Sequence, residues 1–260
     1  MEYVEYLRVR KAFFVFAVIV AAVTVLIVVS VFAATHGALG GHVVVNGRHV
    51  GASEMQSPPI PLGVLLGIAG YAAVVFATIC ASSLNKEHDG LNFVFVKPVP
   101  RSVLALRYVA VDAAGILAAF AYALLVIEVF PLASFGLLRD VYVDGRAWWV
   151  GGLGLGVAFM WYGLLQAITV QYRGKGGTIV GFSWAFFAIM VTVPALTFLG
   201  PIVGKLVFVI ELFNPLAYFT AIADHPSGYL VSSILGFALE TRVALVWAIA
   251  GLSIAYAVTA

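Results

Sequence analysis

The chain has 260 residues, of which 63% are hydrophobic and only 10% are charged, and its formal net charge is +2. Soluble domains carry about 25% charged residues, so this composition, with a mean hydropathy of +1.08, excludes an ordinary soluble domain and predicts a protein embedded in lipid. The small net charge gives no sign of a nucleic-acid partner, and the single cysteine, Cys80, cannot build a disulfide or cysteine-metal framework.

Six apolar runs are each long enough to cross about 30 Å of hydrocarbon as a helix. They cover residues 12–34, 62–82, 104–130, 148–170, 178–200 and 243–260. Helices are expected because backbone groups in lipid must be satisfied within their own segment, and these runs lack the alternation of barrel strands. The first run is too long for a cleavable signal peptide. We therefore predict an all-α polytopic membrane protein, with six transmembrane helices in a single domain over residues 1–260.

Lysine and arginine are divided unevenly between the two sides of this topology. Nine lie at the amino end and around the loops after the second and fourth runs: Arg8, Arg10, Lys11, Lys86, Lys97, Arg101, Arg107, Arg173 and Lys175. The other five lie in longer loops on the opposite side: Arg48, Arg139, Arg146, Lys205 and Arg242. Short cytoplasmic loops carry the excess of positive charge, so we predict a multi-pass protein of the plasma (inner) membrane with both termini in the cytoplasm.

The amino-terminal residues 1–11, MEYVEYLRVRK, interleave apolar and charged side chains. This pattern is typical of a short amphipathic helix that lies on the inner membrane surface. The alternative is a solvated flank that only supplies positive charge.

The first outer loop, residues 35–60, contains Asn46-Gly47 between β-branched residues, which is the signature of a tight hairpin turn. A small extracellular β-hairpin is therefore expected. Pairing about this turn would bring His42 and His49 to one face near His36. A metal site is conceivable there, and the alternative is that these histidines are ordinary polar loop residues.

Glycine pairs four residues apart predict close helix contacts. These pairs are Gly63/Gly67, Gly152/Gly156 and Gly200/Gly204. The pattern is common in membrane helices, so it indicates packing and does not by itself indicate an oligomer.

The third run carries two acids, Asp112 near its inner end and Glu128 near its outer end. An acid within a membrane span is a candidate functional residue by default. Anchoring at the two membrane boundaries, where water reaches a side chain, is one interpretation. A role in a substrate path or in pairing helices is the other.

The segment after the fifth run is long and interrupted. Pro194 is expected to kink the run itself. Residues 201–242 are broken by Pro215, Pro226 and Gly228, so they predict an outer re-entrant region of short helices rather than a clean span.

The chain lacks the motifs of a self-contained enzyme. Its nearest approach to a phosphate-binding loop is YRGKGGT at 172–178, but Lys175 is followed by Gly176 instead of Ser or Thr, and Thr169 stands where a glycine is required. We therefore predict that the chain is not an enzyme, has no catalytic or metal-binding residues, and uses 171–177 as a tight cytoplasmic turn.

The loop over residues 83–102 concentrates polarity in an otherwise apolar chain. Its first part is charged, its middle is aliphatic and aromatic, and Pro98 and Pro100 close it. A short helix across the membrane mouth could bury the apolar residues and present the charges to a partner, while the prolines stop it and start the next span. The alternative is a simple positive loop with interfacial phenylalanines.

The run NKEHDGLNFVFVKPVPRSVLALRY, which starts at Asn85, resembles the loop of ABC-2 type transporter permeases. In that family an acid-rich turn and a glycine precede apolar residues, a proline–arginine turn and a basic residue that opens the third span. Glu87, Gly90, Pro98, Arg101 and Arg107 stand in those places. FNPLAYFTA, residues 213–221, is similar to the Asn-Pro-aromatic segment before the last span of such permeases. The chain departs from the pattern at Leu91, where threonine is usual, and in its long 35–60 loop.

The resemblance implies a type V-like exporter fold and a permease dimer surrounded by membrane lipid. ATP and Mg would bind to a separate cytoplasmic ABC ATPase subunit, and no cofactor is expected on this chain. Residues 83–97 would form the first coupling helix, and 171–177 would be equivalent to the second. ATPase docking would involve Lys86, Glu87, His88, Asp89, Gly90, Arg101, Arg173 and Lys175.

Two other classes of function stay open at this point. The chain could be an ion-coupled secondary transporter or channel that uses Asp112 or Glu128, or a structural membrane subunit that transports nothing itself. The apolar composition of the spans weakly favours a lipophilic or amphipathic cargo for a transporter.

Overall fold

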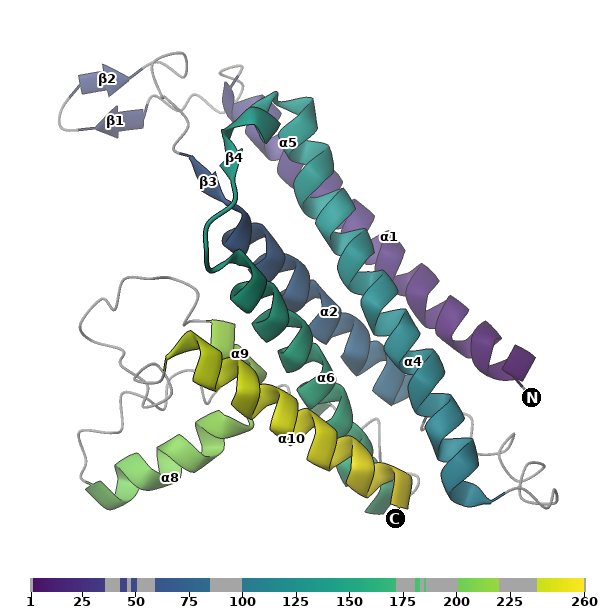
Figure 1. The fold of residues 1–260 in the computed structure, drawn as a ribbon. Coiled ribbons are helices and arrows are strands. Elements are labelled where there is room, and N and C mark those ends of the chain that lie inside the picture. Colours follow the sequence, from purple (N-terminus) through teal and green to yellow (C-terminus); the bar gives the residue numbers. More distant parts are fainter. Residues whose placement is uncertain are drawn as a thin grey trace.

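The computed structural model describes residues 2–35, 43–45, 48–50, 59–84, 100–171, 181–182, 185, 201–219 and 238–259. Long helices dominate these residues (Figure 1). The helices are α1 (Glu2–Thr35), α2 (Leu62–Leu84), α4 (Arg101–Ala123), α5 (Phe130–Ser134), α6 (Ala147–Gln171), α8 (Pro201–Leu212), α9 (Pro215–Phe219) and α10 (Leu239–Thr259). A π-helical turn, η2 (Leu124–Val129), joins α4 to α5, and a 3-10 turn, η3 (Leu137–Asp140), follows.

Five helical segments are long and apolar enough to cross a membrane. They are Tyr6–Ser30, Leu62–Ala81, Ser102–Ser134, Ala147–Thr169 and Leu239–Thr259. Five of the six predicted spans are therefore found at their expected places, and the chain is a helical protein suited to a membrane. The remaining predicted span, 178–200 with Pro194, lies almost entirely outside the described residues and stays a prediction.

The spans pack around α6. Its most extensive contacts are with α2 and α10, and α2 also packs against α4. Helix α1 lies along the side of α4 and η2 and also contacts α2 (Figure 1). Both chain termini, the C-terminal ends of α2 and α6 and the N-terminal end of α4 lie toward the same, lower end of the bundle in this view.

Glycines allow the tightest helix contacts. At the crossing of α2 and α6, a β-carbon added to Gly70 would lie 2.5 Å from the Cα atom of Gly154. The predicted pair Gly152/Gly156 faces α10, where a β-carbon on Gly156 would lie 2.8 Å from Val246. Close approach of this kind increases the number of dispersion contacts between two helices. These contacts matter in a membrane because lipid tails are as apolar as the side chains, so the hydrophobic effect does not drive the helices together.

The amino-terminal segment differs from the prediction. Residues 2–11 do not form a separate helix on the membrane surface, because α1 continues unbroken for 34 residues. At 1.5 Å per residue it is about 51 Å long, which exceeds the hydrocarbon thickness of about 30 Å. One stripe of α1 is buried against its neighbours at every fourth residue: Arg8, Ala12, Phe16, Val20 and Thr24.

The predicted hairpin is confirmed as a two-stranded antiparallel sheet, β1 (Val43–Val45) and β2 (Arg48–Val50). Val45 pairs with Arg48, which is the strand pairing expected of that hairpin, while Asn46 and Gly47 themselves lie outside the described residues. A second, parallel pair is formed by β3 (Ile60–Pro61) and β4 (Val141–Tyr142). That the hairpin is extracellular stays a prediction.

The upper end of the bundle in Figure 1 is fixed by a polar contact between α2 and the loop before α6. The backbone N–H of Gly63 donates to the Asp144 carboxylate at 3.3 Å. This satisfies one of the N–H groups that a helix leaves unpaired in its first turn. Nearby, Trp148 at the start of α6 is 77% exposed, which suits an aromatic ring at a membrane–water boundary.

Candidate functional site

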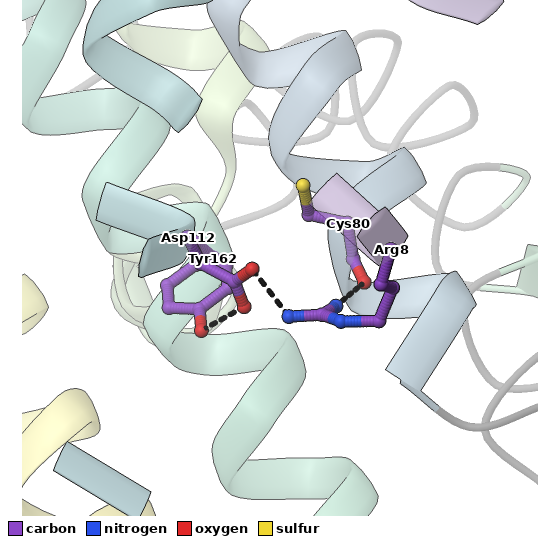
Figure 2. Close-up of polar contacts among 4 residues, drawn as sticks. All are labelled: Arg8, Cys80, Asp112 and Tyr162. Carbon is purple, nitrogen blue, oxygen red and sulfur yellow. Dashed lines mark hydrogen bonds and ion pairs between the residues drawn. The ribbon is translucent and has the colours of Figure 1, made fainter. Parts of the chain in front are cut away.

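Four helices converge on a buried ion pair. The Arg8 guanidinium of α1 donates to the Asp112 carboxylate of α4 at 2.5 Å, and its other terminal nitrogen donates to the Cys80 carbonyl of α2 at 3.3 Å. The Tyr162 hydroxyl of α6 donates to the second Asp112 oxygen at 2.6 Å. Figure 2 shows Arg8 between Asp112 and Cys80, with Tyr162 on the far side of the carboxylate.

Burial makes the members of this cluster depend on one another. Arg8 is 3% exposed, and Asp112 is fully buried. A charge so far from water is tolerated only when it is paired and its remaining hydrogen-bonding capacity is used. Both carboxylate oxygens of Asp112 and two guanidinium nitrogens of Arg8 have partners here, so the cluster ties α1, α2, α4 and α6 together at one level of the bundle.

This geometry corrects two interpretations from the sequence. Arg8 is not a solvated flank residue, and Asp112 is not held at a boundary by water, because each neutralises the other inside the bundle. Asp112 therefore pairs helices. The signal that could have found Arg8 is its place on the four-residue stripe of α1, which continues the apolar positions Ala12 and Phe16. No sequence signal pointed to Tyr162.

An aromatic layer lies above the ion pair, toward the α5 end. Phe13 and Phe16 of α1, Phe76 of α2 and Tyr122 of α4 meet with ring centroids 5.4 to 6.4 Å apart, mostly edge to face. The Tyr122 hydroxyl donates to the Ala17 carbonyl at 3.4 Å. Such pairs add to the contacts that hold α1 against α2 and α4.

Glu128 lies beyond the aromatic layer and is also buried. It is 7% exposed, and its Oε1 atom has no hydrogen-bond partner among the residues that the structure describes. It lies in η2, where the backbone follows the rare π-helical pattern that occurs often at functional sites. Since 16 residues separate it from Asp112, the two acids are about 24 Å apart along the helix axis.

The π-helical turn explains why Glu128 faces inward. The buried face of α4 passes through Ile116, Ala119 and Ala123, at steps of three and four residues. A further α-helical step would place residue 126 or 127 on this face, yet both are only half-buried. The wider turn moves the buried position to Glu128, five residues after Ala123.

Buried polar side chains also gather at a third place, the corner between α8 and α9. Glu211 and Asn214 are each 1% exposed, and Tyr218 is fully buried. The Tyr218 hydroxyl donates to the Leu212 carbonyl at 2.9 Å, and burial, together with the nearby Glu211 charge, raises the pKa of Tyr218. The Asn-Pro-aromatic segment thus makes a packed corner against α6 and α2. Its depth in a membrane, and the rest of 201–242, stay predictions.

The residues predicted to dock an ATPase fall mainly outside the described part of the chain. Lys86, Glu87, His88, Asp89, Gly90, Arg173 and Lys175 all lie there. Arg101 is described as the first residue of α4, with Pro100 at its N-cap, which is where the closing prolines were expected to start the span. Arg107 is exposed one to two turns further on.

Within the described ranges, no group of three or more His, Cys, Asp or Glu side chains could hold a metal ion. His36 and His42 lie outside these ranges, so the conceivable histidine site of the first outer loop stays untested. Comparison with known proteins gives no further guide, because no protein-family model, curated protein or solved structure matches this chain.

Proposed function

We propose that this chain is the permease subunit of an ATP-driven ABC-2 type exporter, in which it forms the substrate path and couples to a separate ATPase. The observation that carries the proposal is the placement of helix ends. The two segments proposed to couple, 83–102 and 171–177, begin at the C-terminal ends of α2 and α6, and α4 starts where the first one closes. These ends lie together at one end of the bundle (Figure 1).

The buried ion pair supports the same proposal. A push on the segments that follow α2 and α6 must reach the other spans to change access to a substrate path. The cluster of Arg8, Cys80, Asp112 and Tyr162 links α1, α2, α4 and α6 near this end. Packed elements joined by such a network move as discrete units instead of deforming continuously.

The proposed assembly follows from this division of labour. The chain lies in the plasma (inner) membrane with both termini and both coupling segments in the cytoplasm, and it forms a dimer. ATP and Mg bind to the ATPase subunits, so this chain does not hydrolyse ATP itself. Among the docking residues, Glu87 is the acid that would meet a basic group of the ATPase.

Charge reversal at Glu87 tests the proposal. Glu87→Arg should abolish binding of an ABC ATPase encoded beside this chain and remove its stimulation by the permease, because like charges repel at the contact. The matched control is Glu240→Arg, an exposed acid in the first turn of α10. Co-purification and ATP turnover in proteoliposomes measure both effects. Wild-type complexes that show no ATP-dependent transport would contradict the function, whereas an unaffected Glu87→Arg complex would contradict only this contact.

A second candidate is an ion-coupled secondary transporter, and the burial of Glu128 without a partner in the described structure favours it. Asp112 is less suited to bind a coupling ion because Arg8 and Tyr162 already occupy its oxygens. Proteoliposomes separate the two candidates. Transport driven by an ion gradient without any ATPase would replace the exporter proposal.

A further inference from the structure

Glu128 stands out among the acids of the five described spans. Asp112 is paired with Arg8, and Glu240 is exposed at the start of α10. Glu128 instead points into the bundle, with no hydrogen-bond partner for Oε1 in the described structure. Burying such a group without compensation is costly, especially in a membrane. The π-helical turn that brings it inward is a backbone irregularity at the same place.

No described polar group forms a hydrogen bond with the Glu128 Oε1 atom. The turn η2 packs against α1 and α2. The contacts Arg8–Asp112 and Ala17–Tyr122 set a constant offset between α1 and α4, and extending it places Glu128 about level with Thr24. Thr24 is buried, and its hydroxyl donates to the Val20 carbonyl, so it has no proton left to donate to the carboxylate. Neither Thr24 nor Val20 can supply a positive charge to the Glu128 carboxylate.

We propose that Glu128 binds the positive centre of a lipophilic organic cation, which is the cargo class of this chain; the inference rests on the permease function proposed above. A cation would neutralise the carboxylate that the described structure leaves unpaired. The aromatic layer of Phe13, Phe16, Phe76 and Tyr122 lies about two to three turns below and offers apolar and π-electron surface to the substituents of such a cation.

The scarcity of oxygen ligands distinguishes this cargo from a metal ion. Hard cations such as Ca²⁺ and Mg²⁺ take six or more oxygen ligands, and the described residues contain no cluster of acids, histidines or cysteines that could supply them. A large organic cation needs no such shell, because its charge is spread and its apolar groups pack against side chains. One carboxylate within an apolar bundle matches that requirement.

The test uses two probes of equal size and opposite charge on the full chain in nanodiscs of uncharged lipid, without ATPase. Tetraphenylphosphonium should bind saturably, and tetraphenylborate should not. Glu128→Gln, which keeps the shape and removes the charge, should weaken tetraphenylphosphonium binding by at least about tenfold. The matched control Glu240→Gln should bind like the wild type. Glu128→Asp keeps the charge and should retain part of the affinity.

Several results would overturn the inference. They are saturable binding of the anion as tight as that of the cation, no saturable binding of tetraphenylphosphonium to folded wild-type chain, or unchanged binding by folded Glu128→Gln. Competitive displacement of the probe by Na⁺ would assign the carboxylate to a small coupling ion instead. If Glu128→Gln does not fold, the comparison of the two probes on wild-type chain still decides. Because no ATPase is present, this result stands or falls separately from the ATP-driven function.

Discussion

Arg8 and Asp112 show how one contact between residues 104 positions apart decides the environment of both. If either residue were removed, the other would remain as an uncompensated charge in an apolar bundle. Together with Tyr162 and the Cys80 carbonyl they form a satisfied network. Glu128 lies about 24 Å further along the same span, in η2, and its Oε1 atom lacks such partners in the described structure. The two acids of one span therefore have different environments.

Removal of Arg8 should destabilise the bundle strongly. Arg8→Ala leaves Asp112 buried with only the Tyr162 hydroxyl, so the free energy of unfolding in detergent should fall by about 3–5 kcal/mol. Arg10→Ala, which removes an exposed arginine two residues away, should change it by about 0.5 kcal/mol or less. Arg8→Met combined with Asp112→Asn removes both charges and keeps an acceptor for Tyr162, so it should recover at least half of the loss. Equal effects of Arg8→Ala and Arg10→Ala would contradict the buried pair.

At the scale of elements, helix contacts depend on where side chains are smallest. The α2–α6 crossing occurs at Gly70 and Gly154, whereas the predicted Gly63 lies beside Asp144 and Val150. Glycine spacing alone could not select the crossing, because every glycine in a helix offers a close approach and only the partner surface decides which is used. The π-helical turn η2 is likewise a property of the packed element, since it sets which side of the helix meets α1 and α2.

A single methyl group should separate the two helices at their crossing. Gly70→Ala would place a β-carbon 2.5 Å from the Gly154 Cα atom, so the helices must shift, and stability should fall by about 1–3 kcal/mol. Gly251→Ala is the matched control, because a β-carbon there meets nothing within 4 Å, and both changes share the same gain in helix propensity. Thermal unfolding in detergent measures the difference. A Gly70→Ala protein as stable as Gly251→Ala would contradict the crossing.

At the scale of the whole molecule, charge distribution predicts orientation and the helix arrangement makes it testable. Ser102 lies at the start of α4, and Val143 lies beyond the other end of the same span, in the loop before α6. Both residues are exposed. Cys80 is fully buried and is replaced by alanine in both variants. A membrane-impermeant maleimide should label Val143→Cys in intact cells and Ser102→Cys only after permeabilisation, since positive loops stay in the cytoplasm. The reverse pattern would invert the proposed topology.

Sequence alone determined the class of this protein, the positions of five spans and the small hairpin. These features are local: a long apolar run lowers its transfer free energy into lipid wherever its neighbours lie, and Asn46-Gly47 favours its turn through its own backbone preferences. Only the tertiary structure decided that Arg8 leaves the flank to neutralise Asp112, that Tyr162 completes the cluster, and that Glu128 faces inward. These outcomes depend on the rotation and register of one helix against another. Small differences in packing determine that rotation and register, whereas the hydrophobicity of either helix alone does not.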